Sequence, residues 1–214
     1  MTPDKGEFME SYIRSFIAID LSDPARRRIE TLIQELRKSD AQVGWVRTEG
    51  IHLTLKFLGN VAPESIEEIK SALARIASQI APIRIEPAGC GAFPTIKWPR
   101  VIWVGLGGQI GPLAELVRRV ETALVPLGFE PEGRPFKPHL TLGRVKGRQR
   151  LQALQEILLA HSDFAAEPFD AAEVVLYKSD LRPDGALYTP LISAFLRKPR
   201  PGGRINHIPC EFTK

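Results

Sequence analysis

The sequence GIHLTLKFLG at residues 50–59 and the sequence PHLTLGRV at residues 138–145 decide the fold. Both contain the tetrapeptide HLTL, which begins at His52 and again 87 residues later (139 − 52) at His139. Each copy is typical of a β-strand, and each is followed by a helical pattern and then by further strand-like segments. The repetition predicts an internal duplication in which two lobes face each other across a cleft.

Strand-like and helix-like segments alternate along the rest of the chain. β-Branched and aromatic residues favour strands, and amphipathic patterns favour helices. The strand-like segments are 14–21, 83–93, 100–106, 169–179 and 186–196, and the helical ones are 24–38, 63–80, 112–127 and 148–161. We expect an α+β fold, with a mainly antiparallel sheet in each lobe and helices on its outer face. A single bilobal domain is expected at residues 14–197, between an N-terminal extension (1–13) and a basic C-terminal tail (198–214).

The composition is that of a soluble globular protein, with 43% hydrophobic and 25% charged residues. No apolar run is long enough to cross a bilayer, and the first fifteen residues lack the apolar stretch of a signal peptide, so we expect a cytoplasmic protein without a membrane partner. Cys90 and Cys210 are predicted to be free thiols, because no CxxC motif or Cys/His cluster accompanies them. The net charge of +4 suits an anionic partner such as RNA, although the arginines at 26–28 are interpreted as a solvated helix face.

Strand alternation places His52 and Thr54 on one face, and His139 and Thr141 on the corresponding face of the second copy. The leucines between them point to the core. One neutral imidazole can take a proton from an attacking water while one imidazolium protonates a leaving oxygen, and threonine hydroxyls can hold phosphate oxygens. The paired motif therefore indicates phosphodiester chemistry that requires no metal or cofactor.

The paired motif and its flanks resemble the two-histidine (2H) phosphoesterase superfamily, and within it the RNA 2′,3′-cyclic phosphodiesterases, also called 2′-5′ RNA ligases. The resemblance extends from RSFIAIDL at residue 14 to the region around residue 188. It implies a two-lobed fold, His52 as the proton donor to the departing 3′ oxygen, His139 as the base that activates water, and a 2′-phosphate product. Thr54 and Thr141 match phosphate-contacting positions.

Three further residues are candidate substrate contacts. The resemblance implies this role for Phe57 and Arg144, each five residues after a histidine. Strict alternation places both on the face opposite the histidines, so they reach the cleft only if the strands bend, bulge or end. Phe57 fits core packing as well as base stacking, whereas Arg144 suits the core poorly. Lys56 shares the His52 face under strict alternation and is a weaker candidate.

The expected partners are RNA, such as tRNA fragments or other RNA with cyclic phosphate ends, or small cyclic phosphates, and the expected assembly is a monomer. Two other functions stay open. A reverse-type reaction would join a cyclic phosphate end to a 5′-hydroxyl and make a 2′-5′ linkage. A non-catalytic RNA-binding module would keep the fold alone, although binding does not require two matched His/Thr pairs.

Overall fold

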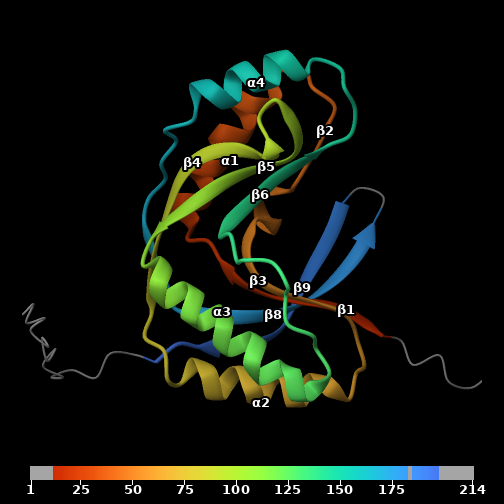
Figure 1. Ribbon diagram of the computed structural model, residues 1–214, viewed down its shortest axis with the longest axis vertical. Helices are drawn as coiled ribbons and strands as arrows, with labels where there is room; N and C mark the ends of the chain where they lie inside the picture. The colour runs from red at the N-terminus through yellow and green to blue at the C-terminus, as the bar shows by residue number, and fades with distance from the viewer. Residues whose placement is uncertain (1–11, 183–184, 198–214) are drawn as a thin grey trace, which may run out of the picture.

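The computed structural model describes residues 12–182 and 185–197; the C-terminal tail and most of the N-terminal extension lie outside this part (Figure 1). Its elements follow in this order: β1 (Ile13–Asp20), α1 (Asp23–Arg37), β2 (Val43–Trp45), the 3-10 helix η1 (Thr48–Gly50), β3 (His52–Val61), α2 (Ser65–Ala77), β4 (Ile83–Thr95), β5 (Trp98–Gly108), α3 (Ile110–Leu124), η2 (Val125–Leu127), β6 (His139–Val145), α4 (Leu151–Ala160), β7 (Phe169–Ala171), β8 (Glu173–Arg182) and β9 (Gly185–Phe195).

The described strands form one antiparallel sheet in the order β7-β4-β5-β6-β3-β1-β8-β9, with β2 paired to β6. The two strands that begin with HLTL are neighbours at its centre, where Leu53 pairs with Leu140. On the β3 side α2 packs beside α3, and on the β6 side α1 packs beside α4 (Figure 1). The predicted α+β architecture with two lobes is confirmed.

The internal repeat is visible as two units with the same order, β1-α1-β3-α2-β4 and β5-α3-β6-α4-β8. α1 and α3 are each 15 residues long and begin 87 residues apart (110 − 23), as the two histidines do. The last strand of each unit crosses into the other lobe, because β4 pairs with β5 and β8 pairs with β1. The lobes are therefore interwoven, and neither half of the chain forms a lobe by itself.

The core lies between the sheet and the helices. Leu53, Leu55, Leu140 and Leu142 are at most 4% exposed, as alternation within the HLTL strands predicts. Helix α1 is capped by the Ser22 side chain and buries residues spaced three or four apart along one face. This packing fixes the two central strands, and with them the opposite, polar face of each HLTL motif.

Strict alternation ends after HLTL in both central strands. In β3 the register with β1 shifts beside Leu55, so Leu55 and Lys56 are both buried and Phe57 is 66% exposed. In β6 the register with β5 shifts beside Leu142, and the fifth residue after the histidine, Arg144, is exposed. An irregularity of this kind reverses the side-chain direction downstream of it. The bend on which the roles of Phe57 and Arg144 depended is therefore present in both strands.

Candidate active site

Both histidines begin a central strand and are held by the same backbone contact. The Nδ1 atom of His52 lies 2.9 Å from the carbonyl oxygen of Gly50, and that of His139 lies 2.7 Å from the carbonyl oxygen of Lys137. A carbonyl oxygen only accepts hydrogen bonds, so Nδ1 carries the proton and donates it in each case. Nε2 remains available on both rings, as a proton acceptor when the imidazole is neutral and as a proton donor when it is charged.

His52 is packed among aromatic rings. Its ring stacks on Phe16 with centroids 4.5 Å apart, and the ring of Tyr188 meets it edge-on at 5.2 Å. Burial lowers the pKa of His52 below the ordinary value of 6.5, although the hydrogen bond to Gly50 and the nearby Asp20 carboxylate favour the protonated form. In the ligand-free protein this environment favours the neutral imidazole.

Several contacts hold the surroundings of His52 in place. Tyr177 stacks on Phe16 with centroids 5.3 Å apart and lies 6.3 Å from the His52 ring, and its hydroxyl donates to Asp20 over 2.6 Å. The guanidinium of Arg26 donates to the carbonyl oxygens of Thr48 and Ile51, at 2.7 and 3.5 Å. These carbonyls flank Gly50, so Arg26 clamps the turn that orients the His52 ring.

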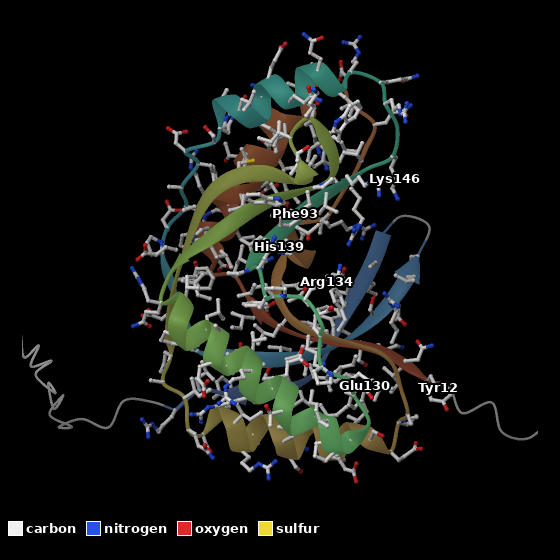
Figure 2. All side chains as sticks on the ribbon, in the orientation of Figure 1. Tyr12, Phe93, Glu130, Arg134, His139 and Lys146 are labelled. Carbon is white, nitrogen blue, oxygen red and sulfur yellow. The ribbon has the colours of Figure 1, made fainter. Side chains whose placement is uncertain are left out.

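His139 has a more open environment. Phe93 approaches its ring edge-on with centroids 5.1 Å apart; both residues are labelled in Figure 2. The His139 side chain faces a groove of about 820 Å³ between β3, α3 and the loop of residues 128–138. Both histidines are partly exposed, but among the described residues His139 contacts one aromatic ring and His52 contacts three, and His139 faces the larger hollow.

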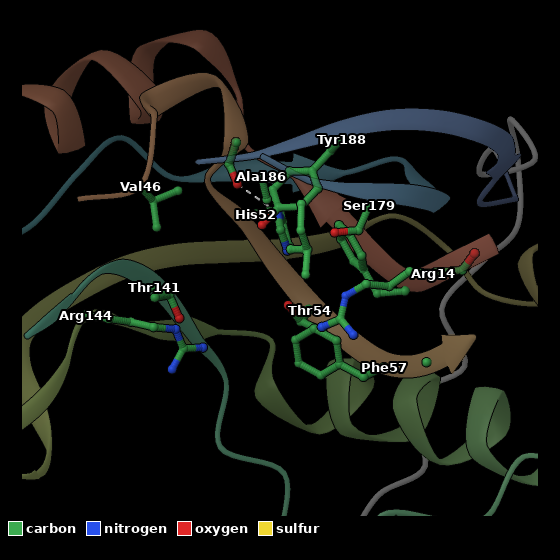
Figure 3. Close-up of a pocket in the computed structure, with 15 residues that line it drawn as sticks. Arg14, Val46, His52, Thr54, Phe57, Thr141, Arg144, Ser179, Ala186 and Tyr188 are labelled. Carbon is green, nitrogen blue, oxygen red and sulfur yellow. Dashed lines mark hydrogen bonds between the residues drawn. The ribbon is translucent and has the colours of Figure 1, made fainter. Parts of the chain in front are cut away.

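Most of the predicted site residues line a second cavity, of about 350 Å³, which adjoins this groove (Figure 3). His52, Thr54, Thr141, Phe57 and Arg144 all face this cavity. Thr54 and Phe57 line the groove beside His139 as well, so the two hollows meet at these residues. The structure thus brings both His/Thr pairs to one place, with Phe57 and Arg144 beside them.

Lys56 is the exception among the predicted substrate contacts. The register shift turns its side chain into the lobe, where only 6% of the residue is exposed. Its ammonium group pairs with Glu121 at 2.5 Å and donates to the carbonyl oxygen of Glu130 at 2.7 Å. The expectation that Lys56 shares the His52 face was wrong, because it assumed unbroken alternation. Its ammonium group thus links β3 to α3 and to the loop that follows α3.

No sequence motif singles out the residues around His52. Phe16, Tyr177 and Tyr188 come from β1, β8 and β9, which the topology brings together but which no local pattern links. Arg26 was interpreted as part of a solvated helix face, and that interpretation is wrong, since its guanidinium donates to backbone carbonyls. The sequence indicated its partial burial only through helical spacing, because Arg26 lies next to Ala25 and three residues before Ile29, at the border of the buried face of α1.

Cys90 lines neither hollow. Cys90 is buried as a free thiol, and burial raises its pKa to about 12, whereas Cys210 lies outside the described residues. Within the described ranges, no cluster of three or more His, Cys, Asp or Glu side chains is placed to hold a metal ion. No helix in the same ranges has the length and apolarity to span a membrane.

Known proteins resemble this chain in sequence and in structure. The model of the 2'-5' RNA ligase superfamily matches residues 22–183. A protein of Aeropyrum pernix named RNA 2',3'-cyclic phosphodiesterase is 38% identical over 163 residues, which make up 74% of this chain and 92% of that protein. A Methanothermobacter thermautotrophicus protein of the same name is 33% identical over 177 residues, or 83% of this chain and 95% of that protein.

Solved structures show the same fold. A protein of Thermus thermophilus superposes with a TM-score of 0.73 at 25% identity, covering 88% of this chain and 100% of that one. E. coli LigT in complex with 3'-AMP superposes with a TM-score of 0.68 at 25% identity, covering 87% and 99%. The similarity therefore extends over both lobes.

Proposed function

Because the chain belongs to the 2'-5' RNA ligase superfamily, we propose that it hydrolyses 2′,3′-cyclic phosphate ends of RNA and leaves a 2′-phosphate. The observation that carries the proposal is the matched pair of histidines. Each has Nδ1 fixed by the carbonyl two residues earlier, and each faces one of two adjoining hollows with Nε2 available for proton transfer.

The reaction needs two proton transfers, and the two imidazoles supply both. Nε2 of neutral His139 takes a proton from water as its oxygen attacks the phosphorus. The bond from phosphorus to the 3′ oxygen breaks, and Nε2–H of protonated His52 donates its proton to that oxygen. The product is a 2′-phosphate beside a free 3′-hydroxyl. A proton then returns from His139 to His52 through solvent, which restores the starting state.

The assignment of His52 as acid has an electrostatic requirement. Burial disfavours its protonated form in the ligand-free protein. A phosphate anion bound beside the ring favours the imidazolium and offsets this burial. His139 lies in the more open groove, where water can approach a neutral ring. The difference in environment fits one histidine that is charged by its substrate and one that activates solvent.

The remaining residues of the cavity suit binding of the phosphate. The hydroxyls of Thr54 and Thr141 donate to the non-bridging oxygens, and the guanidinium of Arg144 supplies positive charge at the edge of the same cavity. The exposed ring of Phe57 offers a surface on which a base can stack. We further propose that the protein is a cytoplasmic monomer and that its substrates are tRNA fragments or other RNA with cyclic phosphate ends.

The test is incubation of the purified protein, in EDTA, with a short RNA that ends in a 2′,3′-cyclic phosphate. The product is identified by chromatography against authentic 2′- and 3′-phosphate standards, and His52→Ala and His139→Ala are assayed alongside. We expect a 2′-phosphate from the wild type and strongly reduced rates from both variants. A wild-type protein that binds this RNA without converting it would instead support the non-catalytic binding module.

A further inference from the structure

The two hollows that meet at Thr54 and Phe57 differ in charge. The groove beside His139 holds acidic and basic side chains that compensate each other, as in the pairs of Lys56 with Glu121 and Arg134 with Glu132. Among the described residues, the cavity beside His52 is lined by two arginines and by no acidic side chain. A polyanion such as RNA is therefore attracted to the His52 cavity more strongly than to the groove.

Arg14 and Arg144 are the two arginines of the His52 cavity. Neither forms an ion pair with an acidic side chain in the part of the chain that the structure describes. Figure 3 shows them on opposite sides of the cavity, with His52 and Thr54 between them. Both influence Tyr188: burial raises the pKa of this tyrosine, and the two positive charges oppose part of that rise. The proposed function assigns Arg144 to the cyclic phosphate, and it assigns no role to Arg14.

The register of β1 with β3 places Arg14 at one end of the cavity. Arg14 lies two residues before Phe16 on the same face of the strand, and Phe16 stacks on His52. In the register of β1 with β3, Phe16 pairs with Phe57 and Arg14 with Asn60, so the backbone of Arg14 lies beyond Phe57 at one end of the cavity. Its side chain extends from there into the cavity (Figure 3).

The lining of the same cavity includes exposed apolar side chains. Phe57 is 66% exposed and Leu181 is 71% exposed, and both face this cavity together with Tyr188. Exposed apolar side chains that line a cavity indicate a ligand with an apolar surface. A nucleoside has such a surface, and in RNA it lies between two phosphates.

We propose that Arg14 binds the phosphate on the 5′ side of the nucleotide that carries the cyclic phosphate, so that the cavity holds a nucleoside with a phosphate at each end. This inference rests on the proposed function and extends it to the substrate class. The preferred substrates are then RNA chains or 5′-phosphorylated nucleotides, and a lone nucleoside 2′,3′-cyclic phosphate is a poorer one.

Calorimetric binding of two product-like nucleotides tests the assignment. Adenosine 2′,5′-bisphosphate and adenosine 2′-monophosphate differ only in the 5′-phosphate. We expect the bisphosphate to bind the wild type about 10-fold more tightly, which is the lower range for a charged hydrogen bond, here partly screened by solvent. Arg14→Gln should bind the two equally, and Arg14→Lys should keep part of the preference. The matched control is Arg75→Gln, an exposed charge on α2 outside both hollows, which should keep the full preference.

Turnover is measured in the same samples with adenosine 2′,3′-cyclic phosphate, with and without a 5′-phosphate. The ratio of the two kcat/KM values should favour the 5′-phosphorylated substrate and fall towards one in Arg14→Gln. An undiminished binding preference in Arg14→Gln, or none in the wild type, would overturn the Arg14 site even if turnover is normal. Absence of turnover with the binding preference intact would instead refute the proposed function and leave the phosphate site standing. Failure of the wild type to bind either nucleotide would count against both.

Discussion

The two HLTL strands have identical tetrapeptides but unequal surroundings. Each histidine donates from Nδ1 to the carbonyl two residues before it, and each strand has a register shift after the fourth residue of the motif. His52, however, is packed against Phe16 and Tyr188, whereas His139 meets the edge of Phe93 and faces the larger hollow.

This difference separates what the motif determines from what the rest of the fold determines. The orientation of the ring and its tautomer are local, because the hydrogen bond to the carbonyl is made within two residues of the strand. The electrostatic environment comes from β1, β8 and β9 on one side and from β4 and the loop of residues 128–138 on the other. Duplication supplied two equivalent imidazoles, and the unequal surroundings fit the proposed roles of acid and base.

The largest expected effect comes from removing either histidine. His52→Ala and His139→Ala should each lower kcat by about 10²- to 10⁴-fold, because each abolishes one proton transfer. The measurement is single-turnover hydrolysis of a cyclic phosphate RNA in EDTA. The matched control is His161→Ala, since His161 lies at the end of α4 and faces neither hollow.

The double variant sharpens the same comparison. Mutations of residues that act as a unit do not have additive effects on kcat. His52→Ala/His139→Ala should therefore have a kcat only slightly below that of the less active single variant. A full additive loss would indicate that the two rings act in separate steps. Wild-type kcat in either single variant would show that the two copies of the motif are not a catalytic pair.

Lys56 offers a comparison at the position after each tetrapeptide. The equivalent residue in β6 is Gly143, where a Cβ would lie 2.7 Å from the Val43 side chain of β2. Lys56 instead pairs with Ile17 of β1, and its long side chain reaches Glu121 of α3. Lys56→Met should lower the free energy of unfolding by about 2 kcal/mol, because it leaves the part-buried carboxylate of Glu121 without its ammonium partner.

Urea unfolding followed by circular dichroism measures this loss. The double variant Lys56→Met/Glu121→Leu should recover much of the stability, since it removes the stranded charge as well. If Lys56→Met is as stable as the wild type but loses RNA binding, the lysine contacts substrate after all.

The sequence predicted the elements that follow from local pattern. The repeat, the buried leucines and the pairing of His52 with Thr54 and of His139 with Thr141 all depend on periodicity within a few residues. The register shifts depend on the neighbouring strands β1 and β5, so the exposure of Phe57 and the burial of Lys56 were not readable from β3 alone. Arg26 acts through backbone carbonyls 22 and 25 residues away, and its place at the border of the buried helix face gives no indication of these partners.

Variants of Thr54 and Thr141 test whether the two HLTL strands contribute equally to binding of the phosphate. Thr54 lines both hollows, whereas Thr141 lines only the cavity beside His52. Thr54→Val and Thr141→Val keep the shape and remove a hydroxyl, and each should lower kcat/KM by about 10- to 100-fold through a lost hydrogen bond to a charged oxygen. Because Thr54 is central to both hollows, its variant should show the larger loss. Equal losses in steady-state assays would point to a phosphate held symmetrically between the strands.

The smallest expected effect is a displacement of the pH profile, and it decides which histidine is the acid. As the acid, His52 must be protonated, so kcat/KM falls as pH rises through its pKa, and burial places this alkaline limb below the pH at which an exposed histidine loses its proton. Tyr188→Ala admits water to the ring and should raise the pKa of His52, which moves the alkaline limb to higher pH. Phe93→Ala, the matched change beside His139, should leave that limb where it is. If Tyr188→Ala moves the acid limb instead, His52 is the base, and the roles of the two histidines are reversed.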